Sequence, residues 1–84
     1  MRRAEEAILD ALKAGEFLLS VHAACRMSQG SVTAADIRAC GRTARSCFYQ
    51  AQYGTWRIDG EDLDGEMLTV ICGVDDSVVI VTIF

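Results

Sequence analysis

The sequence predicts an α+β fold, in which N-terminal helices pack on one face of a C-terminal antiparallel β-sheet. Two observations support this class. Residues 3–41 contain three segments in which apolar residues recur at helical spacing, each bounded by capping or stop residues. Residues 46–84 are rich in β-branched and aromatic side chains and are divided by turn sequences. The 84 residues make a single domain, with 1–15 as an N-terminal helix and 16–84 as its core.

Helical periodicity predicts the first helix over residues 3–13, and Gly15 can take the left-handed conformation that ends a helix. A short extended link follows over 16–19. Ser20 is a good N-cap, because its side chain can accept a hydrogen bond from the first turn. We therefore expect a second helix over 21–29.

A capping box marks the start of the third helix. Gly30 can close the second helix, and Thr33-Ala34-Ala35-Asp36 then places an acid three residues after an N-cap threonine. We expect the third helix over 33–41, closed by Gly41.

The second half of the chain alternates between strands and turns. The last strand is apolar on both faces, so we expect both to be covered. The helices would cover one face. The other face would be covered by a dimer mate, by a partner chain or by the segment around Trp56. The expected strands span residues 46–53, 56–59, 67–74 and 78–84.

Charge is unevenly distributed along the chain. The net charge is −4, which argues against a nucleic-acid binder. Residues 21–58, however, hold five arginines against the single acid Asp36, and residues 59–84 hold seven acids and no base. This segregation can give an acidic protein one basic face. The alternative is a set of solvated arginines that the acidic segment neutralises.

The four cysteines form no C-x-x-C pair, and the sequence shows no signal peptide and no apolar run long enough to span a membrane. We therefore expect a cytoplasmic protein with reduced thiols that serve as small core residues. His22 and Cys25 are spaced like two zinc ligands, but two further ligands at the usual spacing are missing. We expect no metal and no other cofactor.

His22, the only histidine, stands four residues before Arg26, so the two share one helix face. A metal-free ribonuclease needs a base, an acid and a cation that holds the phosphate. His22 can be the base or the acid, Arg26 can hold the phosphate, and Tyr49 or Tyr53 can supply the complementary proton.

A structural role for the same pair is the alternative. His22 would then donate a hydrogen bond to a neighbouring backbone carbonyl, and Arg26 would pair with an acid such as Asp59 or Glu61.

Motifs in a fixed order along most of the chain resemble one family, the domain of unknown function 4258 family. They are Ser20-x-His22-Ala23-x-x-Arg26-Met27, then Gly30 and Val32-Thr33-x-x-Asp36-Ile37, then Trp56-Arg57-Ile58-x-Gly60, Asp64-Gly65-x-x-Leu68-x-Val70 and Val81-Thr82. The resemblance covers roughly residues 17–84. That family usually carries a second arginine where this chain has Gln29, whose amide can hydrogen-bond a phosphate but cannot neutralise it.

This family is similar to the RelE/ParE-type toxins, small α+β proteins encoded beside an antitoxin. Many of those cleave messenger RNA, and others inhibit gyrase. The resemblance implies a RelE/ParE-like domain and a toxin or toxin-like protein, with metal-free cleavage of messenger RNA as its activity and a cognate antitoxin, RNA or the ribosome as partners. The candidate catalytic residues are His22, Arg26 and Tyr49, and the candidate RNA-binding residues are Gln29, Arg38, Arg42, Arg45 and Arg57.

The sequence leaves open whether the chain is an enzyme. One alternative is a non-catalytic protein-interaction module on a toxin-like fold, which the net charge, Gln29 and the doubly apolar last strand favour. Another is a small dimeric structural domain. Because about half the residues of this small chain are apolar, we expect a homodimer or a tight complex with a partner protein, and no contact with a membrane.

Overall fold

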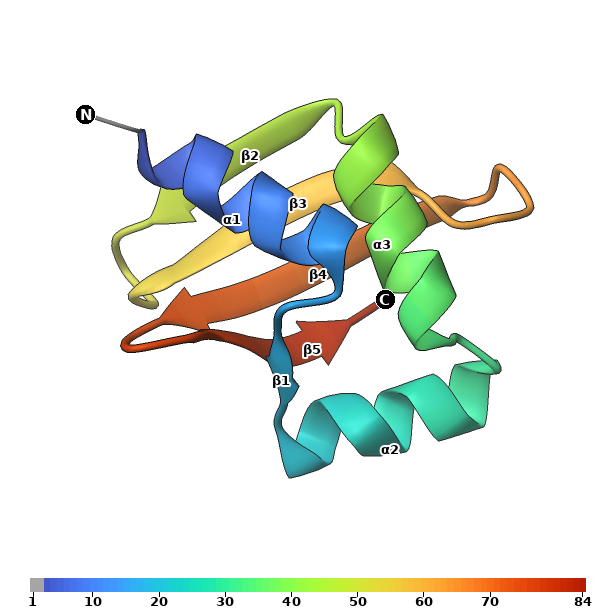
Figure 1. Cartoon of the computed structure of the whole chain (residues 1–84). Coiled ribbons are helices and arrows are strands. Elements are labelled where there is room, and N and C mark those ends of the chain that lie inside the picture. The colour runs from blue at the N-terminus through green and yellow to red at the C-terminus, as the bar shows by residue number, and fades with distance from the viewer. Residues whose placement is uncertain (1–2) are drawn as a thin grey trace.

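The computed structural model describes residues 3–84, in which three helices and five strands follow one another (Figure 1). The predicted α+β class is confirmed, with one short strand added where we expected an extended link. In chain order the elements are α1 (Ala4–Ala14), β1 (Leu18–Leu19), α2 (Val21–Gly30), α3 (Ala34–Thr43), β2 (Ser46–Gln50), β3 (Thr55–Glu61), β4 (Met67–Val74) and β5 (Val78–Ile83).

Local capping sets three of the helix boundaries as the sequence predicts. Gly15 ends α1 in the left-handed conformation, with φ 76°. The Ser20 hydroxyl accepts a hydrogen bond from the Ala23 N–H at the start of α2. Thr33 and Asp36 form the full capping box of α3, each side chain accepting a hydrogen bond from the other residue's backbone N–H.

Two glycines that we expected to end helices do not. Gly30 is the last residue of α2, and Ser31 takes the left-handed conformation instead, with φ 57°. Gly41 lies inside α3, which continues to Thr43. A Cβ at Gly41 would lie 2.8 Å from the Cβ of Leu12 in α1. The glycine is therefore needed for close packing of the two helices rather than for a turn.

The sheet has the order β1-β5-β4-β3-β2. As predicted, the last strand lies inside the sheet. The prediction of a wholly antiparallel sheet is wrong at one edge, because Leu18 and Leu19 run parallel to Val79 and Ile80. Two apolar residues between helices carry no pattern that reveals a pairing partner, so this pairing was not predictable from the sequence.

Helices α1 and α3 pack against each other, and α3 packs on β3 and β4, so this pair lies across one face of the sheet (Figure 1). Helix α2 lies apart from them and contacts β5 and β1. The three helices therefore do not form the single layer that we expected. None of them is long and apolar enough to cross a membrane. The core draws on all three helices and three strands: Ile8, Leu12, Ala23, Met27, Ile37, Cys40, Ile58, Leu68, Val70, Cys72, Ile80 and Ile83.

The other face of the sheet, here called the open face, carries the side chains that point away from this core. Ile58, Val70 and Ile83 are register partners and belong to the core. Because side chains alternate between faces, the neighbouring register row must point the other way. That row is Phe48, Arg57, Ile71 and Thr82.

The open face of the last strand is not covered by any other part of residues 3–84. Trp56 packs against the core, on the side where the helices lie, so it does not provide the cover that we considered. Val81 and Phe84 remain exposed, Phe84 to 56%. Cover of this face by a dimer mate or a partner chain therefore stays a prediction.

The four cysteines are free thiols in different environments. Cys40 and Cys72 are buried in the core and Cys47 packs against it, as predicted, but Cys25 is exposed on α2. Burial raises the pKa of the Cys40 and Cys72 thiols to about 12 and that of Cys47 to about 11. These three are therefore almost fully protonated at pH 8.

We expect one fast-reacting thiol in the folded protein, because the thiolate is the reactive form and needs access to the reagent. A colourimetric thiol reagent at pH 8 should modify Cys25 at once and the other three only on unfolding. Cys25→Ser should remove the fast phase completely. A fast phase that survives this substitution would show that the core thiols are accessible.

Candidate functional site

Asp59 is the centre of a polar cluster on the open face. Its carboxylate accepts hydrogen bonds from the hydroxyls of Ser46 on β2 (3.0 Å) and Thr69 on β4 (2.7 Å), and from Nε–H of Arg57 on its own strand (3.2 Å). Burial alone would raise the pKa of Asp59, but these hydrogen bonds and the Arg57 charge outweigh it and hold the pKa below its ordinary value. Asp59 is therefore a fixed carboxylate at neutral pH.

Arg57 is held on two sides. Asp59 binds the Nε edge of its guanidinium, and the ring of Phe84 lies under the guanidinium carbon, 5.6 Å from the ring centroid. Its terminal nitrogens donate no hydrogen bond to residues 3–84, and 36% of the side chain is exposed. A guanidinium oriented in this way presents its outer donors to an incoming anion, and its fork matches a phosphate or a carboxylate.

A hollow of about 540 Å³, here called the Tyr53 hollow, opens beside Arg57. Its apolar residues and its two aromatic rings suit flat ligands such as nucleobases, which stack on Tyr and Phe side chains. Its lining residues are Gln50, Tyr53, Thr55, Arg57, Ile71, Val81 and Phe84.

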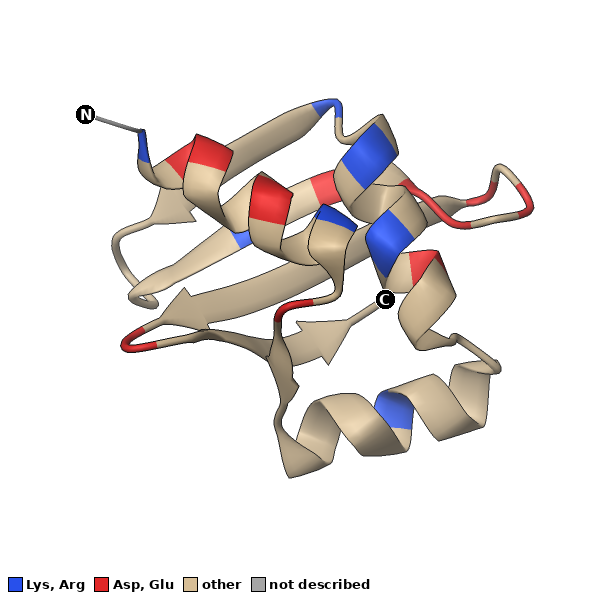
Figure 2. Cartoon of the chain, viewed as in Figure 1, with Lys and Arg blue, Asp and Glu red and all other residues tan. Residues whose placement is uncertain are grey.

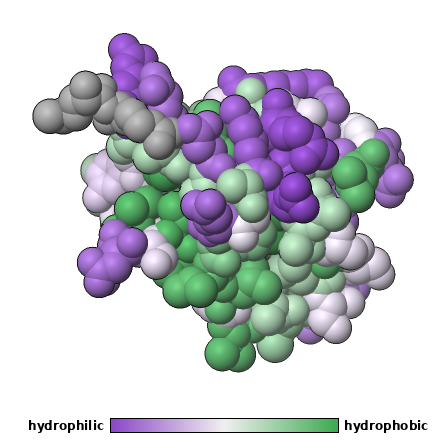
Figure 3. All heavy atoms as spheres, in the orientation of Figure 1, coloured by the Kyte–Doolittle hydropathy of each residue, from purple (hydrophilic) through white to green (hydrophobic). Residues whose placement is uncertain are grey.

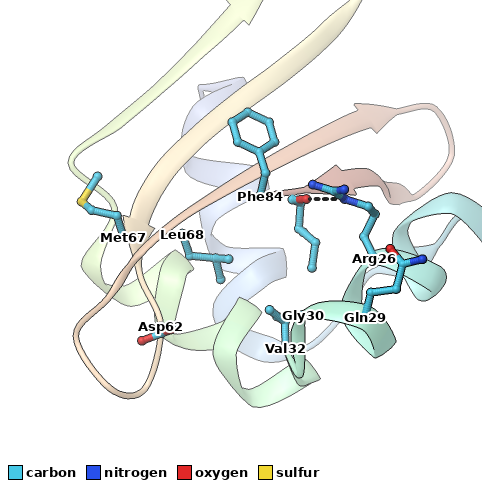
Figure 4. A pocket seen from close by; sticks show the side chains of 9 residues that line it. Arg26, Gln29, Gly30, Val32, Asp62, Met67, Leu68 and Phe84 are labelled. Carbon is cyan, nitrogen blue, oxygen red and sulfur yellow. Dashed lines mark hydrogen bonds between the residues drawn. The ribbon is translucent and has the colours of Figure 1, made fainter.

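A second hollow, of about 370 Å³ and here called the Arg26 hollow, shares Phe84 with the first. Figure 4 shows the side chains of Arg26 and Gln29 projecting from α2 on one side of it, with Met67 on the other. Nε–H of Arg26 donates a hydrogen bond to the backbone carbonyl of Ile83 (3.4 Å). Phe84 is therefore flanked by Arg57 in one hollow and by Arg26 in the other.

Three of the predicted site residues, Arg26, Gln29 and Arg57, line the two hollows that share Phe84. His22 lies one turn before Arg26 on α2, is exposed, and lines neither hollow. Its side chain forms no hydrogen bond or ion pair with another residue in the described part of the chain.

Tyr49 is not brought to His22 and Arg26. Its ring contacts Trp56, with 5.4 Å between ring centroids, and it faces away from the open face because it alternates with Phe48 on β2. Strands β4 and β3 separate β2 from β5, a distance of about 14 Å at the usual strand spacing. The predicted catalytic trio is therefore not assembled within one chain.

The structural alternative predicted that Arg26 forms an ion pair with an acid such as Asp59 or Glu61, and this prediction is wrong. Asp59 pairs with Arg57, and Glu61 pairs with Arg45 at 2.6 Å. Arg26 binds a backbone carbonyl instead.

The remaining predicted RNA-binding arginines lie elsewhere. Arg38 donates from Nε–H to the carbonyl of Lys13 at the end of α1, Arg42 is exposed on α3, and Arg45 is occupied by Glu61. Figure 2 shows the basic positions spread over α1, α3, α2 and the sheet, with acidic positions between them. The single basic face that we considered is not formed over residues 3–84.

The sequence indicated Asp59 only as a possible partner of Arg26, and it did not indicate Phe84 or the two hydroxyls that bind Asp59. Arg57 and Asp59 are two residues apart on one strand, so their shared face was visible in the sequence. The contribution of Ser46, Thr69 and Phe84 depends on strand register, which the sequence does not display. No group of three or more metal-binding side chains occurs in the described residues.

A family model described as "Domain of unknown function (DUF4258)" matches residues 19–84. The match spans α2, α3 and strands β2 to β5, and therefore every residue placed around Phe84 above. No curated protein and no solved structure was found to match the chain.

Proposed function

The chain belongs to the DUF4258 family, and from this premise we propose that it is a toxin-like protein of the RelE/ParE type that binds single-stranded RNA on the open face of its sheet. The observation that carries the proposal is the setting of Arg57. A carboxylate fixes one edge of its guanidinium, an aromatic ring supports one face, and the residue lines a hollow that also includes Tyr53 and Phe84.

Single-stranded RNA matches this site better than a duplex. Its unstacked bases expose their faces, and Tyr53 and Phe84 offer rings on which a base can stack. Arg57 and Arg26, on either side of Phe84, can each contact a backbone phosphate, and Gln29 can add a hydrogen bond. A duplex would hide its base faces and leave the aromatic rings without a role.

The geometry supports RNA binding better than RNA cleavage. General acid–base catalysis needs two proton-transfer groups within hydrogen-bond reach of one phosphodiester. His22 lies on α2, which packs near the β1 edge of the sheet, and Tyr49 lies on β2 at the opposite edge. We therefore expect labelled RNA to stay intact with the protein, with or without ribosomes. If the protein cleaves RNA and His22→Ala abolishes the cleavage, this expectation is contradicted and the protein is an endoribonuclease.

The dependence of binding on salt tests the proposed site. Two arginine–phosphate contacts predict a slope of about −1.4 when the logarithm of the association constant is plotted against the logarithm of salt concentration. Fluorescence anisotropy with a labelled oligouridine measures it. A slope near zero, or one steep enough for five or more phosphates, would contradict a site built on Arg26 and Arg57.

A toxin-like role predicts an effect on growth. We propose that overproduction of the protein in the cytoplasm slows growth and that co-production of its cognate antitoxin relieves it. Arg57→Gln should relieve it as well. If the wild type and this variant inhibit growth equally, toxicity does not depend on RNA binding at Arg57.

The second candidate function is a non-catalytic protein-interaction module. The observation that favours it is an exposed apolar segment at the β1 edge of the sheet, where Leu18 and Val21 are 59% and 83% exposed. Monomeric proteins rarely leave neighbouring large apolar side chains uncovered. The expected homodimer or tight complex with a partner protein remains a prediction, and sedimentation at micromolar concentration measures whether the protein alone is a dimer.

A further inference from the structure

The apolar surface at the edge strand β1 lies apart from the residues around Phe84. Leu18 and Leu19 are 59% and 42% exposed, and Val21, at the start of α2, is 83% exposed. Figure 3 shows apolar surface over this region, below the polar surface of α1 and α3. Strand β1 pairs on one side only, with β5, so its outer edge is open to another chain.

A groove of about 460 Å³, here called the β1 groove, lies at the start of β1 and includes Leu18. Phe17, Leu18 and Val78 give it an apolar wall, and it is closed by the end of α1 and the β4–β5 hairpin. Its charged lining residues are two acids, Glu16 on one side and Asp76 on the other. Both are exposed, and neither forms an ion pair with another residue of the described chain.

We infer that the β1 groove docks an apolar segment of a partner protein that is flanked by lysine or arginine. The apolar wall needs leucine- or valine-like side chains, and the two unpaired acids of the lining favour positive flanks. A second copy of this chain matches these features less well, because none of the strands in residues 3–84 has a lysine or arginine at both of its ends. The inference does not depend on RNA binding.

Two synthetic peptides test the inference by fluorescence anisotropy. Both carry alternating leucine and valine, one flanked by lysine pairs and the other by glutamate pairs. The lysine-flanked peptide should bind roughly tenfold more tightly, as expected from two exposed ion pairs. The double variant Glu16→Lys, Asp76→Lys should reverse this preference. The matched variant Asp64→Lys, Glu66→Lys makes the same charge change in a distant loop and should leave the preference unchanged.

The apolar wall is tested separately with Leu18→Ser. Because Leu18 is exposed, this variant should keep the melting temperature of the wild type while weakening binding of both peptides. Equal binding of the two peptides, or a preference that both double variants reverse alike, would overturn the inference. So would sedimentation showing a wild-type dimer that Leu18→Ser dissociates, because the groove would then hold a second copy.

Discussion

Arg57→Gln is expected to weaken binding of single-stranded RNA by at least about tenfold. A hydrogen bond to a charged group contributes about 1.5–3 kcal/mol, and glutamine provides neither the charge nor the fork. The RNA affinity of Arg57→Lys should lie between those of the wild type and Arg57→Gln. Lysine keeps the positive charge but lacks the planar guanidinium that Asp59 and Phe84 orient. Fluorescence anisotropy with the labelled oligouridine gives the three affinities.

Arg45→Gln is the matched control. Arg45 is also an arginine paired with an acid, but its partner is Glu61 and it lines neither hollow. Its exposed ion pair contributes little to stability. We expect RNA affinity within about twofold of the wild type. Equal losses from the two substitutions would mean that the protein binds RNA through net charge and not through the residues around Phe84.

Gly60→Ala is expected to destabilise the fold by about 3 kcal/mol, as overpacking of a filled interior does. A Cβ at Gly60 would lie 2.5 Å from the backbone carbonyl oxygen of Cys40 and 3.1 Å from Oγ1 of Thr43. The Thr43 hydroxyl also accepts a hydrogen bond from the Glu61 N–H, so it is not free to move away. In a domain of this size the loss corresponds to a melting temperature lower by about 12–24 °C.

Gly73→Ala provides the comparison for this prediction. Gly73 is also a strand glycine, but a Cβ there meets no atom within 4 Å and its φ is compatible with alanine. Because alanine costs less chain entropy than glycine, this variant should melt at or slightly above the wild-type temperature. Thermal melting followed by circular dichroism measures both variants. Similar melting temperatures for the two would mean that β3 and α3 are not in close contact.

Much of the fold was predictable because local chemistry determines it. The cap at Ser20 and the capping box at Thr33 and Asp36 act within one helical turn, so their sequence positions were sufficient. The roles of Gly41 and Gly60 were not predictable, because each is set by contact with an element distant in sequence. Leu18 and Leu19 could not be assigned as a strand for the same reason, since they depend on pairing with β5.

The candidate site was predicted in part. Arg26, Gln29 and Arg57 were identified by residue type and motif, and the structure places them in two hollows that share Phe84. Phe84 was missed because nothing in a terminal apolar strand distinguishes a ring that supports an arginine from one that fills a core. Tyr49 was selected over Tyr53, although Tyr53 lines the hollow beside Arg57, because the sequence does not show on which side of a hairpin each ring lies.

The most direct test of the proposed RNA site is an NMR titration of isotope-labelled protein with a short oligouridine. We expect the largest chemical-shift changes at the Arg57 side chain and at the backbone of Ile71, Thr82 and Phe84, with smaller changes at Arg26 and Gln29. Signals from α1 and α3 should stay in place. Changes confined to Arg38 and Arg42, or no changes at millimolar RNA, would contradict binding on the open face of the sheet.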